Sequence, residues 1–197
     1  MVKAARGNRI PGLPPRPSPA LDPYLDAASR CFTRYGIART SVQDIARELG
    51  VNRTTVYRQV GNVDQATRLL VSREMHRILA GLPARMVGLS GPEAAIELLA
   101  TVVEEALAHP VVRKMLNDER ELLGTLLADG IPQLFQEISD RIAPLIGLTV
   151  RAGIIAERDP AILADWLARI AVTVLVSPPR TPLRRFLAEL LVPALTP

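Results

Sequence analysis

The segment from Thr40 to Asn62, TSVQDIARELGVNRTTVYRQVGN, constrains the fold of this chain more than any other part of the sequence. Thr40 and Ser41 are good N-caps, and a residue able to complete a capping box stands three positions after each of them. Gly50 can adopt the positive φ that ends a helix, and Asn52 can cap a second helix. The pattern therefore predicts two short helices joined by a tight turn, a helix-turn-helix.

The apolar residues of this segment repeat at helical spacing, which assigns an inner and an outer face to both helices. The inner positions are Val42, Ile45, Ala46, Leu49, Val51, Val56 and Val60. The second helix then turns polar side chains outward, as a recognition helix does in the major groove of DNA, where arginines and hydroxyl groups contact bases and phosphates. The candidate DNA-binding residues are Thr40, Ser41, Asn52, Arg53, Thr54, Thr55, Tyr57 and Arg58. The same pattern also fits a plain helical hairpin.

Charge is distributed unevenly along the chain. Residues 1–60 carry ten Lys or Arg against four Asp or Glu, whereas residues 61–197 carry fourteen against sixteen. A basic first third on a mildly acidic remainder suits phosphate binding at one end of the molecule. Four basic residues within residues 1–20 are interspersed with five prolines, which predicts an extended or disordered arm. Two interpretations fit this arm: an extension along DNA, and a solvated tail.

Further helices flank the segment. Asp22 and Pro23 predict the N-cap and first position of a helix that closes at Gly36. Asn62 predicts the cap of another helix, which we expect to run to about Leu79. The first of these helices would bury the inner face of the helix-turn-helix, and the second would lead out of this small domain.

The run from Tyr24 to Leu70 resembles the N-terminal domain of the tetracycline-repressor (TetR) family of bacterial regulators. The matching residues are Ala28, Phe32, Gly36, Thr40, Ser41, Ile45, Ala46, Gly50, Val51, Thr55, Tyr57 and Asn62. Two positions depart from the family: Val60 replaces a common aromatic, and Val63 replaces a common lysine that contacts phosphate. A backbone N–H at the following helix N-terminus, Arg58 or the arm could supply that contact.

The remaining chain predicts a larger all-helical domain. We expect helices near residues 92–109, 110–116, 132–152, 160–176 and 182–195, and a polar stretch at residues 117–121 that caps a further helix ending near Leu127. Gly81 to Gly91 predicts a break, and Pro144 with Gly147 predicts a kink or local break. The predicted fold is therefore all-α. Its parts are a basic Pro-rich arm (1–20), a three-helix DNA-binding domain (21–62) and a helical effector-binding and dimerisation domain (63–197).

The last two helices carry more apolar surface than a domain of this size needs on its outside, which favours a two-fold dimer contact. The resemblance implies the same, because the family usually dimerises there as a four-helix bundle. The candidate dimer residues are Ile162, Trp166, Ile170, Val174, Leu183, Phe186, Leu187 and Leu190. The alternative is that these side chains complete the monomer core. A dimer would present two recognition helices to a palindromic operator.

The resemblance also implies a small-molecule effector, bound in the larger domain, that shifts the two DNA-binding domains away from operator spacing. The candidate effector contacts are His76, His109, Met115, Phe135 and Trp166. Each residue has an alternative role in the core or at a helix end. The sequence does not identify the effector.

Composition restricts the other functional classes. The chain has no glycine-rich phosphate loop, and its two histidines and one cysteine cannot form a typical zinc site. We therefore expect no catalytic residues, no metal and no cofactor. A single cysteine, no apolar run of ~18 residues and no signal-like start predict a cytoplasmic, nucleoid-associated protein without a membrane span. Together with these features, the resemblance implies a dimeric repressor that a ligand releases from DNA. The alternatives are a DNA-binding protein without an effector and a helical protein–protein adaptor.

Overall fold

Helices make up all the regular structure in the described part of the chain, as the sequence predicts. The computed structural model describes residues 15–119, 121 and 131–196. A 3-10 turn, η1 (Pro19–Leu21), precedes α1 (Asp22–Tyr35), α2 (Val42–Leu49), α3 (Arg53–Val60), α4 (Val63–Arg85), α5 (Gly91–Ala108), α6 (Pro110–Asp118), α8 (Ile131–Arg151), α9 (Pro160–Val176) and α10 (Leu183–Leu195). None of these helices is long and apolar enough to cross a membrane.

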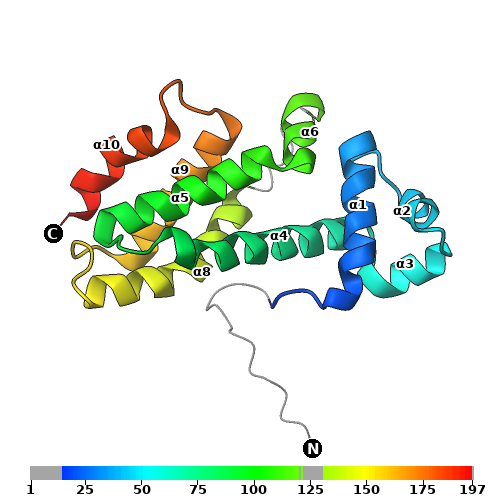
Figure 1. Cartoon of the computed structure of the whole chain (residues 1–197), viewed down its shortest axis with the longest axis horizontal. Coiled ribbons are helices and arrows are strands. Elements are labelled where there is room, and N and C mark those ends of the chain that lie inside the picture. The colour runs from blue at the N-terminus through cyan, green and yellow to red at the C-terminus, as the bar shows by residue number, and fades with distance from the viewer. Residues whose placement is uncertain (1–14, 120, 122–130, 197) are drawn as a thin grey trace, which may run out of the picture.

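The molecule consists of a small head and a larger body (Figure 1). Helices α1 to α3 form the head, and α5, α8, α9 and α10 form the body. Helix α4 begins in the head and extends into the body, and α6 lies between α5 and α1. The structure therefore joins head and body through two helices, α4 and α6.

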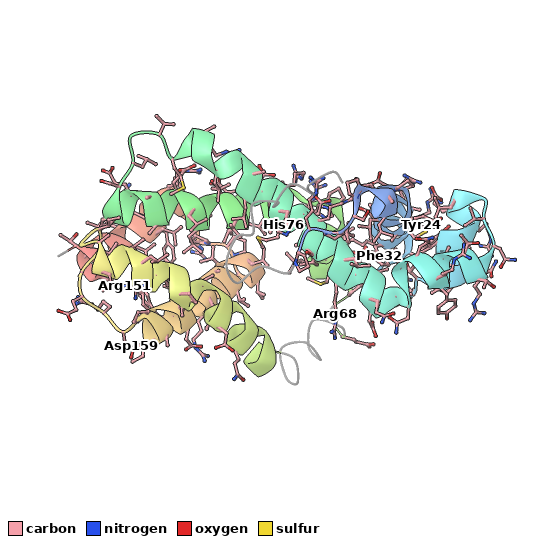
Figure 2. All side chains as sticks on the ribbon, turned by 90° about the horizontal axis from the view of Figure 1, so that it is seen from below. Tyr24, Phe32, Arg68, His76, Arg151 and Asp159 are labelled. Atoms are coloured by element: carbon pink, nitrogen blue, oxygen red, sulfur yellow. The ribbon has the colours of Figure 1, made fainter. Side chains whose placement is uncertain are left out.

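The core of the head is built from most of the apolar positions that the sequence predicts, whereas Val51, in the turn between α2 and α3, is exposed. It contains Leu25, Ala27, Ala28, Cys31, Phe32, Val42, Ile45, Ala46, Val56, Val60, Ala66, Leu70 and Val111. Figure 2 shows Phe32 on α1, within the head. Cys31 is buried here, and this burial raises the pKa of its thiol. Val111 comes from α6, so a helix of the body side completes the core of the head.

Most of the predicted helix caps are present. Ser41 caps α2 in a capping box with Asp44, and Asn52 caps α3 by accepting a hydrogen bond from the Thr54 N–H. Gly50 closes α2 with φ 68°, the left-handed conformation that favours glycine. Asn62 caps α4 in a second capping box.

Two cap assignments differ from the sequence prediction. Thr40 does not cap α2; its buried hydroxyl donates to the Gly36 carbonyl oxygen at 2.6 Å, and so closes the turn after α1. Asp22 is the first residue of α1 and Leu21 is its N-cap, because the 3-10 turn η1 leads directly into the helix.

Helix α4 is longer than the sequence pattern predicts. The pattern places its end near Leu79, whereas the helix continues to Arg85. Gly81 and Pro83, which predict a break, lie inside it. Leu82 is buried, so the apolar face continues past Gly81 and its burial outweighs the poor helix propensity there.

The body is built by packing α8 on α9 and α10 on α5. Its core contains Ile96, Ala100, Ile155, Leu163, Leu187, Leu191 and Leu195. Of the kink or local break predicted at Pro144 and Gly147, the break is wrong, because α8 continues through both residues. Gly147 is buried against Pro160 at the start of α9, so packing on α9 supports α8 at this point. The helix predicted to end near Leu127 lies outside the described residues.

Candidate nucleic-acid interface

The outer face of α3 is an exposed polar surface of the helix-turn-helix. Arg53, Thr54, Tyr57 and Arg58 are exposed on it, whereas Val56 and Val60 are buried on the opposite face. The cap at Asn52 fixes the N-terminal end of α3, which is the end that enters the major groove in such motifs. The apolar period of this short helix therefore determines which side chains can reach DNA.

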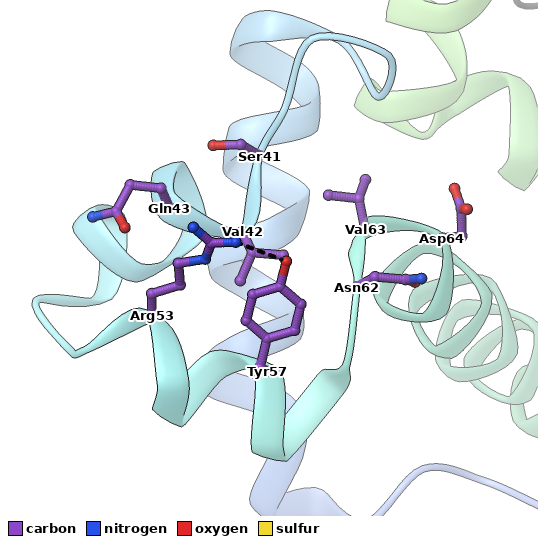
Figure 3. Close-up of a pocket in the computed structure, with 8 residues that line it drawn as sticks. All are labelled: Ser41, Val42, Gln43, Arg53, Tyr57, Asn62, Val63 and Asp64. Carbon is purple, nitrogen blue, oxygen red and sulfur yellow. Dashed lines mark hydrogen bonds between the residues drawn. The ribbon is translucent and has the colours of Figure 1, made fainter.

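Arg53 and Tyr57 form an ordered pair one helical turn apart (Figure 3). The Arg53 guanidinium donates to the Tyr57 hydroxyl at 3.2 Å and lies 5.1 Å from the centre of its ring. Stacking on the ring restricts the rotamers of the long arginine side chain before any ligand is bound. The pair thus presents a preorganised cation beside a hydroxyl group.

A hollow of about 480 Å³ lies beside this pair, between the start of α2, the outer face of α3 and the start of α4. It is lined by Ser41, Val42, Gln43, Arg53, Tyr57, Asn62, Val63 and Asp64. Two helix N-termini meet here, and N–H groups and helix dipoles at such ends favour anions. Together with Arg53, they make the hollow suitable for a phosphate group, although the Asp64 carboxylate opposes this at one edge.

Asp44, the acidic residue nearest the N-cap of α2, is hydrogen-bonded within the head. The Ser41 hydroxyl donates to the Asp44 carboxylate at 2.6 Å, and the Ser41 N–H donates to the same oxygen at 2.9 Å. These hydrogen bonds hold the pKa of Asp44 below its usual value. The charge of Asp44 is therefore engaged in capping α2, while Ser41 remains exposed at the hollow.

The eight candidate DNA-binding residues differ in how far their side chains are exposed. Ser41, Arg53, Thr54, Tyr57 and Arg58 are exposed in the head, and Asn52 is exposed with its side chain engaged as a cap. Thr55 is half-buried. Thr40 is buried and hydrogen-bonded within the turn, so its side chain does not face a ligand as the sequence predicts.

Sequence analysis missed three residues of the hollow as candidate contacts: Gln43, Asn62 and Asp64. Asn62 was assigned only as a helix cap. Their positions in the sequence could have identified them, because all three stand at or near the first turn of a helix in the motif. The sequence could not show that the two helix starts face the same hollow.

The candidate effector residues lie on different elements of the structure. His76 lies half-buried on α4 (Figure 2), and His109 lies half-buried where α5 meets α6. Burial lowers the pKa of both imidazoles. Met115 lies on α6, and Trp166 packs partly buried against the core of the body. Phe135 lies in α8, but its side chain is outside the described residues.

The candidate dimer residues divide into buried and exposed groups. Val174 and Leu187 are buried within the single chain, so they belong to its interior rather than to an outer contact surface. Ile162 is 70% exposed and Leu190 is 42% exposed. The partly buried side chains that pack against the body core are Trp166, Ile170, Leu183 and Phe186. A hollow on α10 is lined by Thr181, Arg185, Phe186, Glu189 and Leu190.

Comparison with known proteins agrees with the helix-turn-helix geometry. Residues 25–62 match the family model of the bacterial regulatory proteins of the tetR family. The head of this chain is therefore similar to the DNA-binding domain of the tetR family. An uncharacterized HTH-type transcriptional regulator of Mycobacterium tuberculosis is 26% identical over 184 residues, which cover 90% of this chain and 86% of that protein.

Solved structures of this family share the whole fold. The TetR-family repressor AlkX from a Dietzia strain, implicated in biodegradation of n-alkanes, has a TM-score of 0.63 at 20% identity, covering 92% of this chain and 97% of its own. The complex of SmeT with triclosan has a TM-score of 0.56 at 22% identity, covering 91% and 93%. SmeT is the repressor of a multidrug efflux pump of Stenotrophomonas maltophilia. The likeness extends over head and body alike.

Proposed function

We propose that this protein is a dimeric repressor that binds a palindromic operator and leaves it when a small molecule binds in the body. The observation that carries the proposal is the outer face of α3, where Arg53 stacks on Tyr57 beside a hollow formed by two helix N-termini. This surface combines a cation, hydroxyl groups and oriented N–H groups, which are the groups that contact base edges and phosphates.

Each part of the interface has a separate role in this proposal. Arg53 and Tyr57 read a base edge or a phosphate in the major groove, and Thr54 and Arg58 contact the flanking backbone. The Ser41 and Asn62 N–H groups are used in their capping boxes, so the N–H groups of the first turns of α2 and α4 that follow them bind a phosphate. The start of α4 thereby supplies the contact that Val63 cannot make.

Dimerisation is supported by exposed apolar side chains on α9 and α10. The exposed Ile162 and Leu190 leave apolar surface on α9 and α10 that a second copy would cover. The relatives include repressors and one complex with a small molecule, triclosan. We infer an effector for this protein by the same logic, and we expect the protein to act at the bacterial nucleoid in the cytoplasm.

Selection from a library of random duplex DNA tests the proposal. The full chain is expected to enrich a palindrome, and the spacing of its half-sites reports the separation of the two heads. Binding that falls with salt but enriches no sequence would indicate an architectural protein instead. No binding at any salt concentration would overturn the proposal and favour an adaptor.

A parallel selection with the Tyr57→Ala variant is the matched control. Tyr57 is exposed, so the variant is expected to fold normally and to bind the selected duplex more weakly. An unchanged affinity would show that Tyr57 does not contribute to the interface, even if the chain binds DNA.

A further inference from the structure

The end of α6 is hydrogen-bonded to the turn that follows α1. Glu119, the C-cap of α6, is only 8% exposed. One of its carboxylate oxygens accepts from the Ile37 N–H at 2.9 Å, and the other accepts from the Ala38 N–H at 2.8 Å. The groups are more than 80 residues apart in sequence, and Figure 1 shows α6 beside the end of α1.

The position of Glu119 is unfavourable for α6 taken alone. A carboxylate at the C-terminal end of a helix opposes the helix dipole, and burial of its charge adds a desolvation cost. Two consecutive main-chain N–H groups offset both effects, because such pairs form a concave site for an anion. The contact with the head therefore explains a glutamate here better than the requirements of α6 do.

The turn is shaped to admit this carboxylate. Gly36 has φ 88°, and a Cβ atom at this position would lie 2.6 Å from a Glu119 carboxylate oxygen. Thr40 holds the other side of the turn through its hydrogen bond to the Gly36 carbonyl oxygen. Ser41 follows directly and caps α2 at the edge of the DNA-facing hollow. A displacement of the turn is thus passed to the start of α2.

The opposite end of α6 is fixed to the body. His109 is both the C-cap of α5 and the N-cap of α6, so no loop separates the two helices. Val111, the second residue of α6, packs in the core of the head. Helix α6 is therefore joined directly to α5 of the body at His109, while its Val111 side chain and the Glu119 carboxylate both contact the head.

We propose that Glu119 is a positioning residue, a latch through which the position of α6 sets the orientation of the head. The inference rests on the proposed function, because the head must bind DNA for its orientation to matter. Coupling is reciprocal, so DNA bound to the head must in turn alter the stability of α6. A contact that only stabilises the fold has no such consequence.

Amide hydrogen exchange of the full chain, with and without the selected duplex, tests this proposal. Glu119→Gln keeps the side-chain size but places an amide NH₂ group against one of the two N–H groups. The matched control is Asp118→Asn, which removes the same charge from the adjacent residue, where the carboxylate pairs with Lys114. Glu119→Asp is a second variant, which keeps the charge and shortens the side chain by one methylene.

In the free protein, exchange of the Ile37 and Ala38 amides is expected to rise roughly tenfold or more in both Glu119 variants, but not in Asp118→Asn. Duplex binding is expected to change exchange across residues 110–118 in the wild type and in Asp118→Asn. This change is expected to disappear in both Glu119 variants.

The latch is overturned if a Glu119 variant that binds the duplex shows the same change in α6 as the wild type. It is also overturned if the exchange of Ile37 and Ala38 is unaltered in the free variants. A wild-type chain that binds no duplex refutes the proposed function and the coupling together. In that case, the exchange rates of the free protein show separately whether the carboxylate holds the turn.

Discussion

Arg73 of α4 donates to the Asp26 carboxylate of α1 at 2.7 Å, and the same guanidinium pairs with Glu74 at 3.0 Å. The Arg73 side chain is only 16% exposed. Its burial lowers the pKa, but these carboxylates outweigh burial and raise it overall. The pair fixes the first helix of the head to the connecting helix, independently of the apolar core.

Replacing Arg73 with Ala is expected to destabilise the protein by about 1–2 kcal/mol, since Glu74 would lose a partner in a half-buried position. Urea unfolding followed by circular dichroism, at fixed protein concentration, measures the change. Arg47→Ala is the control, because Arg47 is exposed and its pair with Asp44 should contribute less than about 0.5 kcal/mol. Equal effects of the two substitutions would contradict this role of Arg73.

Arg53→Lys is expected to weaken binding to the selected duplex by roughly 1–3 kcal/mol, because lysine cannot make bidentate contacts or keep the planar stack on Tyr57. Fluorescence anisotropy at one salt concentration measures the affinity. Arg151→Ala is the control: it removes a charge from an exposed residue at the far end of the body (Figure 2). Because Arg53→Lys preserves the net charge, an affinity equal to that of the wild type would show that only the charge of Arg53, and not its planar geometry, contributes to binding.

Gly36→Ala is expected to destabilise the protein by about 1–3 kcal/mol, because it adds backbone strain and a clash with the Glu119 carboxylate. Gly88→Ala provides the comparison: Gly88 has φ 81°, and a Cβ atom there meets no neighbour. The excess cost at Gly36 therefore measures the clash. An equal loss of stability in the two variants would show that the turn can accommodate the extra methyl group.

His109 predicts a pH dependence of stability. Burial lowers its pKa below the ordinary 6.5, so between the folded and unfolded values the unfolded chain binds more protons. The contribution of the neutral imidazole is therefore complete above pH 6.5 and is lost as the pH falls through the lower, folded-state pKa. In His109→Gln, the unfolding free energy should depend less on pH between about 7 and 5, with the share due to His76 remaining. A slope identical to that of the wild type would exclude His109 as a contributor.

The parts of the fold that could be predicted are those that depend on residues close together in the sequence. The caps at Ser41, Asn52 and Asn62 and the glycine at Gly50 are set by nearby residues, so the helix-turn-helix follows from sequence. The end of α4 does not, because burial of Leu82 in the assembled body decides it. Helix α9 is apolar around most of its circumference, so its pattern could not separate the buried Val174 from the exposed Ile162.

The interface was predictable in part for the same reason. The period of α3 identifies Arg53 and Tyr57 as outward-facing, whereas the hollow requires the starts of α2 and α4 to converge in space. Thr40 shows the limit of the argument: its type and position suit a cap, but the turn uses its hydroxyl internally. The contact of Glu119 with Ile37 and Ala38 could not be predicted from the sequence, because the residues around each partner give no indication of the other.

The burial of Val111 among the side chains of the head has a consequence for how such regulators can be recombined. A reading head excised after α4 would lack one wall of its interior and would expose an apolar patch. Grafting this head onto another regulator would therefore require that α6 be transferred as well, or that the host supply an equivalent side chain. The independently folding unit that contains the head therefore does not end at the end of α4. It includes part of α6, a helix that begins 25 residues after the last residue of α4.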